Sequence, residues 1–297
     1  MATYFGTDGI RGIANISLTH DIAYKCGHAL TTLKDKPTVV ICKDTRISGD
    51  MILYSMAAGI MCGGGNVINC GILPTAGLAY ITRLYKADYG VVISASHNPY
   101  EYNGIKIFSS EGYKLSDEQE EKVEELFNSI NLKTGKDIGI LCDDLKSNDI
   151  YCDFLYSTVP NDISAIKVVL DCAYGASYKV APQVFNRLNC KVIEMNTDLK
   201  KGMINENSGS LYPENLKNEV LKNKADIGFA FDGDSDRVIA CDEKGNIVDG
   251  DILLFIISRH MKNMGKLKKN AVVGTSHTNM GVEKSMQEYG IKLYRAD

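Results

Sequence analysis

The chain alternates short apolar runs with longer segments in which apolar residues recur every three or four positions. Short runs rich in Val and Ile are typical of buried strands, and the longer period is that of amphipathic helices. We expect strands at 38–42, 67–70, 91–93, 105–108, 167–171, 191–195, 227–231, 271–274 and 291–294, and a hairpin over 237–248. We expect helices after Thr19 and at 48–62, 74–86, 117–129, 150–158, 177–188, 214–223, 251–263 and 280–289.

The order strand, loop, helix, strand occurs three times, in segments 38–70, 167–195 and 271–294. This repetition predicts an α/β protein of successive mixed-sheet domains that share one general design. A polar, weakly patterned stretch at 131–149 indicates a boundary. We therefore predict domains at 1–147, 148–248 and 249–297. Because the sequence stops at Asp297 soon after the third unit begins, we expect that third domain to be truncated.

The stretch VVISASHNPYEYNGIKIF, residues 91–108, holds the first candidate chemistry. An apolar strand ends in small and polar residues, and an Asn-Gly turn then leads into a second apolar alternation. Loops at the ends of strands are where α/β proteins place reactive groups. Ser96 is the candidate nucleophile, and His97 and Lys106 are candidate proton carriers. The alternative is an Asn-Pro turn whose serines hydrogen-bond the local backbone.

A second candidate is FDGDSDR, residues 231–237, which follows an apolar strand directly. Its three carboxylates, Asp232, Asp234 and Asp236, stand at alternate positions and can converge on a hard cation such as Mg²⁺. Without a cation they would repel one another. The motif therefore predicts a site for one hard cation per chain.

Two other kinds of site could be built from these carboxylates without the Ser96 segment. A calcium-binding EF-hand would place Glu243 at the twelfth loop position, but Arg237 then stands where the loop's sharp turn needs Gly. A phosphatase with Asp232 as an aspartyl nucleophile explains a strand followed by Asp-x-Asp. It leaves the Ser96 segment without a role.

Composition excludes several classes of function. The formal charge of −4 is not that of a nucleic-acid-binding protein. No apolar run approaches the roughly 20 residues of a membrane span. The nine cysteines form no C-x-x-C pair, so they indicate neither a zinc site nor a disulfide framework. We expect a cytoplasmic protein that binds neither nucleic acid nor membrane. Its oligomeric state is left open.

Three segments together resemble the α-D-phosphohexomutases in order and spacing: TYFGTDGIRG, ISASHNPYEYNGIKIF and FDGDSDR. KDTRISG, INENSGSLYPENL and VVGTSHTNMG also match in kind, so the resemblance covers essentially the whole chain. Within the family, FGTDGIRG and ISASHNP look most like the branch that acts on glucosamine phosphates. The segment Thr275–Thr278 departs from the pattern usual there. A phosphomannomutase or phosphoglucomutase, and a non-catalytic protein that binds Mg²⁺ and phosphosugars, are the alternatives.

The resemblance implies a mechanism and a set of roles. Ser96 would be a phosphoserine, and its phosphate would complete an Mg²⁺ site made by Asp232, Asp234 and Asp236. Lys106 would be the general acid and base, while the remaining phosphate contacts would come from Arg11, His97 and Arg237. The enzyme would interconvert glucosamine 6-phosphate and glucosamine 1-phosphate, with glucosamine 1,6-bisphosphate or a similar bisphosphate as intermediate and activator. Such mutases have four domains, of which this chain would hold two and the beginning of the third.

Overall fold

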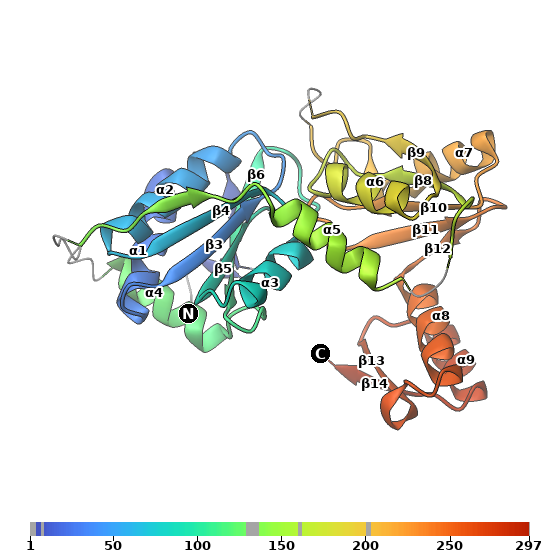
Figure 1. Ribbon diagram of the computed structural model, residues 1–297. Coiled ribbons are helices and arrows are strands. Elements are labelled where there is room, and N and C mark those ends of the chain that lie inside the picture. Colours follow the sequence, from blue (N-terminus) through green and yellow to red (C-terminus); the bar gives the residue numbers. More distant parts are fainter. Residues whose placement is uncertain (1–3, 7–8, 129–136, 160–161, 200–202, 297) are drawn as a thin grey trace.

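The structure, a computed structural model, describes residues 4–6, 9–128, 137–159, 162–199 and 203–296. Two mixed sheets and a smaller strand pair follow one another along the chain, each with its own helices (Figure 1). The expected α/β architecture of successive units is confirmed.

The first sheet has seven strands in the order β1-β2-β6-β5-β3-β4-β7. Its strands are β1 (Phe5–Gly6), β2 (Gly9–Ile13), β3 (Thr38–Lys43), β4 (Asn66–Ile72), β5 (Tyr89–Ile93), β6 (Tyr102–Ser109) and β7 (Leu141–Asp143). Strands β5, β3, β4 and β7 are parallel, whereas β6 runs antiparallel to β5 and β2 antiparallel to β6.

Helices cover both faces of this sheet (Figure 1). One face packs against α1 (His20–Leu33), α2 (Gly49–Cys62) and α4 (Asp117–Asn128) in a core that includes Ile41, Val91 and Ile107. The other face packs against α3 (Thr75–Leu84) and α5 (Ser147–Ser157). Thr19 caps α1 as expected, because its hydroxyl accepts the Ile22 amide N–H at 3.4 Å.

The second sheet has five strands in the order β12-β11-β10-β8-β9. They are β8 (Lys167–Asp171), β9 (Lys191–Met195), β10 (Ile227–Phe231), β11 (Val238–Asp242) and β12 (Ile247–Val248). Its faces carry α6 (Ser177–Arg187) and α7 (Pro213–Asn223), and the segment before α7 holds a 3₁₀ turn, η2 (Gly209–Leu211).

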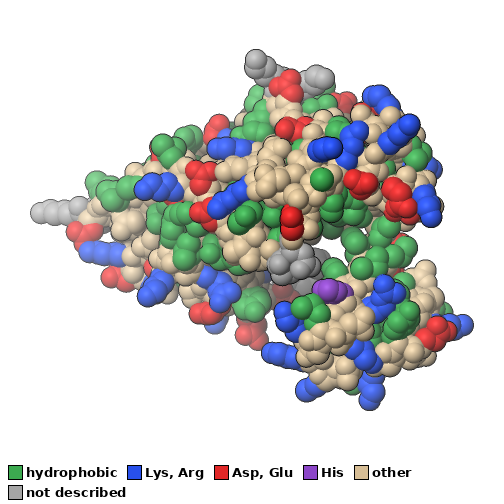
Figure 2. Space-filling model, turned by 45° about the vertical axis from the view of Figure 1, so that its right-hand side comes forward, with side chains coloured by type: hydrophobic (Ala, Val, Ile, Leu, Met, Phe, Trp, Pro, Cys, Tyr) green, Lys and Arg blue, Asp and Glu red, His purple; other side chains and the backbone are tan. Residues whose placement is uncertain are grey.

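The last unit is a parallel pair, β13 (Ala271–Thr275) and β14 (Lys292–Ala296), with α8 (Gly250–Asn263) and α9 (Met280–Glu288). A short 3₁₀ turn, η3 (Lys268–Asn270), leads into β13. This unit forms a separate lobe in Figure 2, and most of the charged side chains on its visible face are Lys and Arg.

The first two units share one arrangement of strands. Strands β4-β3-β5-β6 and β9-β8-β10-β11 have the same order, and in each set three parallel strands are followed by one antiparallel strand. The pair β13-β14 has the parallel pairing of β3-β4 and β8-β9. The predicted common design is therefore confirmed.

One local expectation was wrong, and two strands were not predicted. The glycine-rich segment that ends at Gly12 was not expected as a strand, but Gly9–Ile13 forms β2 against β6; Thr7 and Asp8 lie outside the described residues. Asn103 and Gly104 belong to strand β6 and not to a turn. The polar stretch at 131–149 contains strand β7, which pairs with β4; its residues 131–136 lie outside the described part.

Helix α5 joins the two larger units. Its Tyr151 and Cys152 pack in one cluster with Leu78 of α3 and with Val180 of α6. The core of the first sheet therefore continues into the second unit, although the pattern assigned this helix to the second unit alone. The division near residue 147 stays a prediction. No helix in the described part of the chain has the length and apolarity needed to cross a membrane.

Candidate active site

Ser96 and the three aspartates occupy equivalent places in the two repeated units. The serine loop, residues 94–101, connects the parallel strand β5 to the antiparallel strand β6. The acidic loop, residues 232–237, connects β10 to β11 in the same way. The repeat therefore places both at the carboxyl end of a parallel strand, where open α/β sheets bind ligands.

The two loops meet through Ser96. Its hydroxyl donates a hydrogen bond of 2.6 Å to Oδ2 of Asp232, and both residues are 1% exposed. Ser96 has a φ of +50°, a left-handed conformation that is uncommon for a residue other than glycine. Such outliers concentrate at functional sites, where surrounding contacts hold them in place.

The carboxylates of Asp232, Asp234 and Asp236 converge, with one oxygen from each lying within 4.8 Å of the others. Asp234 accepts a hydrogen bond of 2.7 Å from the Thr75 hydroxyl at the start of α3, which ties the acidic loop to the first unit. Its other oxygen, Oδ1, is buried and has no hydrogen-bond partner among the described residues. A buried carboxylate oxygen without a donor is a ready ligand for a hard cation.

Burial and mutual repulsion perturb these carboxyls. Burial, followed by the charge of Asp234, raises the pKa of Asp232 from 3.8 to about 7. Burial acts in the same direction on Asp234, but the Lys106 ammonium and the Thr75 hydrogen bond outweigh it, so the pKa of Asp234 is lowered. Three acidic side chains in this arrangement fit Mg²⁺, because a divalent cation would offset both the burial and the mutual repulsion that raise the pKa of Asp232.

Lys106 reaches the same cluster from strand β6. Its ammonium lies 3.1 Å from Oδ2 of Asp234 and 3.5 Å from Oδ2 of Asp236, and the residue is 3% exposed. The strand pairing places Lys106 opposite Val92 of β5, two residues before the serine loop begins. The lysine is therefore held beside both loops by the sheet itself.

The other predicted cationic residues surround this cluster. Arg11, on strand β2, donates to the side-chain oxygen of Asn98 at 3.2 Å. The pKa of His97 is lowered by burial and then by the charges of Arg237 and Arg11. The backbone N–H of Arg237 donates to Oδ1 of Asp232 at 3.1 Å, while its side chain is 55% exposed. The structure thus brings together every candidate residue that the sequence indicated.

Four contacting residues were not predicted. The Thr75 hydroxyl donates to Asp234, and Asp44 accepts from the Ser94 hydroxyl. Arg46 and Asn205 both donate to the backbone carbonyl of Ser96 in the serine loop. The segments of three of them gave partial signals, since KDTRISG, which holds Asp44 and Arg46, and INENSGSLYPENL, which holds Asn205, matched the family without an assigned role. Which carbonyl or carboxylate each one binds is decided by tertiary packing.

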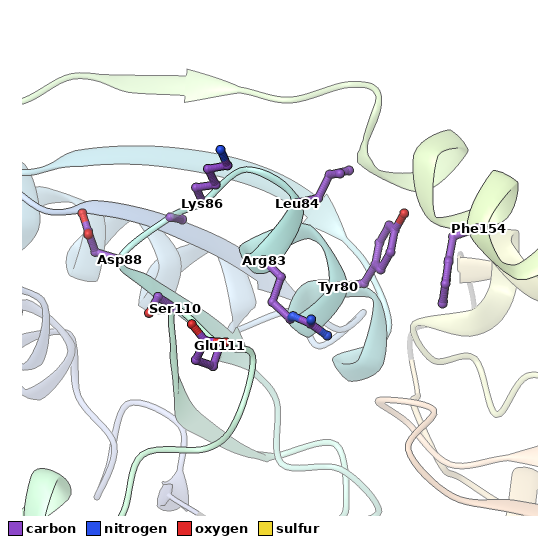
Figure 3. A pocket seen from close by; sticks show the side chains of 9 residues that line it. Tyr80, Arg83, Leu84, Lys86, Asp88, Ser110, Glu111 and Phe154 are labelled. Atoms are coloured by element: carbon purple, nitrogen blue, oxygen red, sulfur yellow. The ribbon is translucent and has the colours of Figure 1, made fainter.

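Two cavities lie near the serine-bearing unit. A pocket of about 310 Å³ borders His97 and is walled by Tyr100, Ile204 and Tyr212, between the serine loop and the 203–212 segment. A larger pocket of about 570 Å³ lies where α3 ends, and Figure 3 shows Tyr80 and Phe154 at one side of it and Asp88 at the other. Asp88 precedes β5 whereas Ser96 follows it, so this larger pocket lies at the opposite end of the strand from the chemistry.

Known proteins share this architecture. The phosphoglucomutase/phosphomannomutase family matches the chain in three parts, its α/β/α domain I over residues 2–134, domain II over 149–245 and domain III over 249–297. Among solved structures, a phosphoglucomutase/phosphomannomutase family protein from Burkholderia thailandensis has a TM-score of 0.84 at 24% identity, over 99% of this chain and 66% of that one. The open form of parafusin, a phosphoglucomutase from Paramecium, has a TM-score of 0.75 at 17% identity, over 99% and 62%.

Curated relatives are more similar in sequence. Phosphoglucosamine mutase of Caldanaerobacter subterraneus subsp. tengcongensis is 50% identical over 302 residues, which cover 99% of this chain and 68% of that protein. Phosphoglucosamine mutase of Clostridioides difficile is 48% identical over 301 residues, covering 99% and 67%. On this similarity the chain belongs to the phosphoglucomutase/phosphomannomutase family, the α-D-phosphohexomutases.

Proposed function

We propose that the chain carries the phosphoryl-transfer residues of a phosphoglucosamine mutase, which interconverts glucosamine 6-phosphate and glucosamine 1-phosphate through a bisphosphate. The observation that carries the proposal is the contact of 2.6 Å between the Ser96 hydroxyl and Asp232, inside a cluster of three carboxylates. A hydroxyl that becomes a phosphoester needs a counter-charge beside it, and this cluster can supply one by binding a cation.

Asp232, Asp234 and Asp236 would hold one Mg²⁺, with an oxygen of the Ser96 phosphate as a further ligand. When bound, the ion would neutralise charge on the phosphoryl oxygens. Arg11, His97 and Arg237 surround the same place and would bind the remaining phosphate oxygens. Arg11 is already fixed on a strand by its bond to Asn98, so its guanidinium is oriented before substrate arrives.

Lys106 would act as the general base in one direction and the general acid in the other. A sugar hydroxyl attacks the phosphorus of phosphoserine 96, and the bond from phosphorus to the serine oxygen breaks. Lys106, as the neutral amine, takes the proton of the sugar hydroxyl, and a proton passes from it to the departing serine oxygen, which becomes the Ser96 hydroxyl. The bisphosphate then binds in the opposite orientation and returns its other phosphoryl group to Ser96, whose hydroxyl proton passes through Lys106 to the departing sugar oxygen. Atoms and charges balance over the cycle, and the serine ends as it began.

Glucosamine phosphate is the proposed substrate because the relatives at about half identity bear that name. Mannose and glucose phosphates are the alternatives, since solved relatives with the same fold are a phosphoglucomutase and a phosphoglucomutase/phosphomannomutase family protein. We place the reaction in the cytoplasm, because all nine cysteines are free thiols. We also retain the domain limits 1–147, 148–248 and 249–297 as a proposal.

A coupled assay of the full-length protein tests this function. The protein is given Mg²⁺ and, in parallel, the 6-phosphates of glucosamine, glucose and mannose, each with its own bisphosphate activator. We expect the highest kcat/KM with glucosamine 6-phosphate, and loss of turnover in EDTA and in Ser96→Ala. A higher kcat/KM for glucose or mannose phosphate would change the substrate assignment. Full activity of Ser96→Ala would refute the mechanism.

A further inference from the structure

Two backbone carbonyls of the serine loop are each bound by the same two side chains. The Ser96 carbonyl accepts hydrogen bonds from Nη2 of Arg46 at 2.9 Å and from Nδ2 of Asn205 at 2.7 Å. The Asn98 carbonyl accepts from the same two nitrogens, at 2.9 and 3.1 Å. Arg46 and Asn205 thus form a carbonyl clamp around the residues on both sides of His97.

Arg46 is the half of the clamp that belongs to the first unit. Its side chain is fully buried, its Nε donates to Asp44, and its Nη1 donates to the carbonyls of Pro99 and Tyr102. With the two bonds of the clamp, its side-chain N–H groups are engaged by the serine loop, by the first residue of β6 and by Asp44. A guanidinium with a fixed fork of donors is suited to this task, whereas an ammonium is not.

Asn205 is the half that comes from the second unit. It is 6% exposed and has a φ of +66°, and its own backbone N–H donates to the carbonyl of Ala173, just beyond strand β8, at 2.9 Å. Both amide hydrogens point across to the first unit's serine loop. Asn205 therefore fixes the serine loop relative to the sheet that carries the acidic loop.

The clamp acts on the backbone of the residue that carries the reactive hydroxyl. The N–H of Ser96 donates to the Ser94 hydroxyl at 2.9 Å, so with its carbonyl clamped the peptide units on both sides are held in the left-handed conformation. Gly233 of the acidic loop packs against the same carbonyl, since a Cβ there would lie 2.6 Å from the Ser96 oxygen. The serine loop and the acidic loop therefore contact each other at the Ser96 carbonyl as well as at the Ser96 hydroxyl.

We propose that Asn205, with Arg46, is a positioning residue for phosphoryl transfer, which holds Ser96 so that its hydroxyl faces the acidic loop. Among the described residues the side chain of Asn205 donates to the Ser96 and Asn98 carbonyls, so it acts through the backbone of the serine loop. This inference rests on the proposed function, because it assumes that Ser96 exchanges phosphate. It adds a cross-unit contact on which the rate of that exchange depends.

The test measures how fast the full-length protein, freed of phosphate, takes up phosphate on Ser96 from glucosamine 1,6-bisphosphate, by quenched-flow mixing and intact mass. In Asn205→Asp a carboxylate faces two carbonyl oxygens and the clamp opens. We expect uptake to slow about 100-fold, the loss typical of a nucleophile displaced by about 1 Å. Mg²⁺ affinity should stay within about threefold, because the ligands of the acidic loop are untouched.

Asn218→Asp is the matched control, since it makes the same change on an exposed face of α7 in the same unit. We expect its uptake rate to equal that of the wild type. Asn205→Ala, which removes the donors without adding charge, covers the case in which Asn205→Asp does not fold, and should slow uptake in the same direction.

Three results would count against the inference. Wild-type rates in Asn205→Asp or Asn205→Ala would overturn the positioning role alone. A parallel loss of Mg²⁺ binding and of thermal stability, in proportion to the loss of rate, would show a purely structural role and overturn it too. A wild-type protein that takes up no phosphate on Ser96 would overturn the proposed function, and this inference with it.

Discussion

The raised pKa of Asp232 predicts that Mg²⁺ binding depends on pH near neutrality. In the metal-free protein Asp232 has a pKa of about 7, against an ordinary value of 3.8, because it is buried beside Asp234. Mg²⁺ must displace the proton that Asp232 then holds. The perturbation is therefore a change of pH from 6 to 8 in unphosphorylated protein at constant ionic strength.

The magnitude follows from single-site linkage between proton and metal. With a pKa of about 7, the apparent Kd is weakened about 11-fold at pH 6 and about 1.1-fold at pH 8, so affinity should rise about tenfold between them. About 0.9 proton should be released for each ion bound at pH 6, and about 0.1 at pH 8. If Asp232 had its ordinary pKa, neither the apparent Kd for Mg²⁺ nor the number of protons released would change measurably between pH 6 and 8.

The free energy of unfolding should change with pH in the direction opposite to that given by a carboxyl whose pKa is lowered on folding. Because the folded pKa is raised, the folded state keeps its proton while the unfolded chain loses it as pH rises above 3.8. This carboxyl therefore lowers the free energy of unfolding as pH rises from about 4 to 7, and Mg²⁺ should restore stability most at the alkaline end.

Titration calorimetry in two buffers of different ionisation enthalpy gives both Kd and the number of protons released. His97→Asn is the matched control, because it removes the neighbouring imidazole and leaves the carboxylates in place, and we expect it to keep the tenfold change. A Kd that does not vary between pH 6 and 8, with no proton release, would refute the reasoning about Asp232.

Three further predictions follow from individual contacts. Lys106→Met removes a positive charge next to Asp234, so Mg²⁺ should bind roughly tenfold tighter by calorimetry while kcat falls at least about 100-fold; weaker Mg²⁺ binding would contradict it. Gly233→Ala sets a methyl 2.6 Å from the Ser96 carbonyl, and should lower the free energy of unfolding by about 1–3 kcal/mol and slow turnover at least about tenfold; wild-type melting and rate would contradict this. Ser96→Ala should take up no phosphate in intact-mass analysis yet bind Mg²⁺ within about fivefold of wild type, since the three aspartates remain; loss of Mg²⁺ binding would contradict it.

The sequence predicted the strands best where a β-branched run is buried. The runs at Lys167–Asp171 and Ile227–Phe231 form strands with the expected limits, because Val, Ile and Phe at these positions enter a core on either side of the sheet. Strand β2 was missed because its sequence, GIRGI, has two glycines and is fixed by pairing with the short strand β1 and with β6, about ninety residues later. Local propensity carries no information about such a partner.

The residues of the candidate site also fall into those that the sequence predicted and those that it did not. Ser96 and the aspartates were recognisable because their side chains carry the chemistry and stand at strand ends, and Lys106 because it is a charged residue within an apolar strand. Arg46 and Asn205 were not, because each acts on backbone carbonyls far along the chain, 50 and 109 residues from the bond each makes to Ser96. A buried arginine shows in sequence only as a charged residue after a strand, and that pattern is more often a solvated loop.

The most direct test of the central claim follows a labelled phosphoryl group from Ser96 to sugar. Full-length protein labelled with ³²P at Ser96 is mixed with unlabelled glucosamine 6-phosphate and Mg²⁺ in a single turnover, and the products are separated. We predict that the label leaves the protein only when the sugar phosphate is present, and that it is found first in glucosamine 1,6-bisphosphate and then in glucosamine phosphate. Label that stays on the protein, or that is released as inorganic phosphate, would contradict the account.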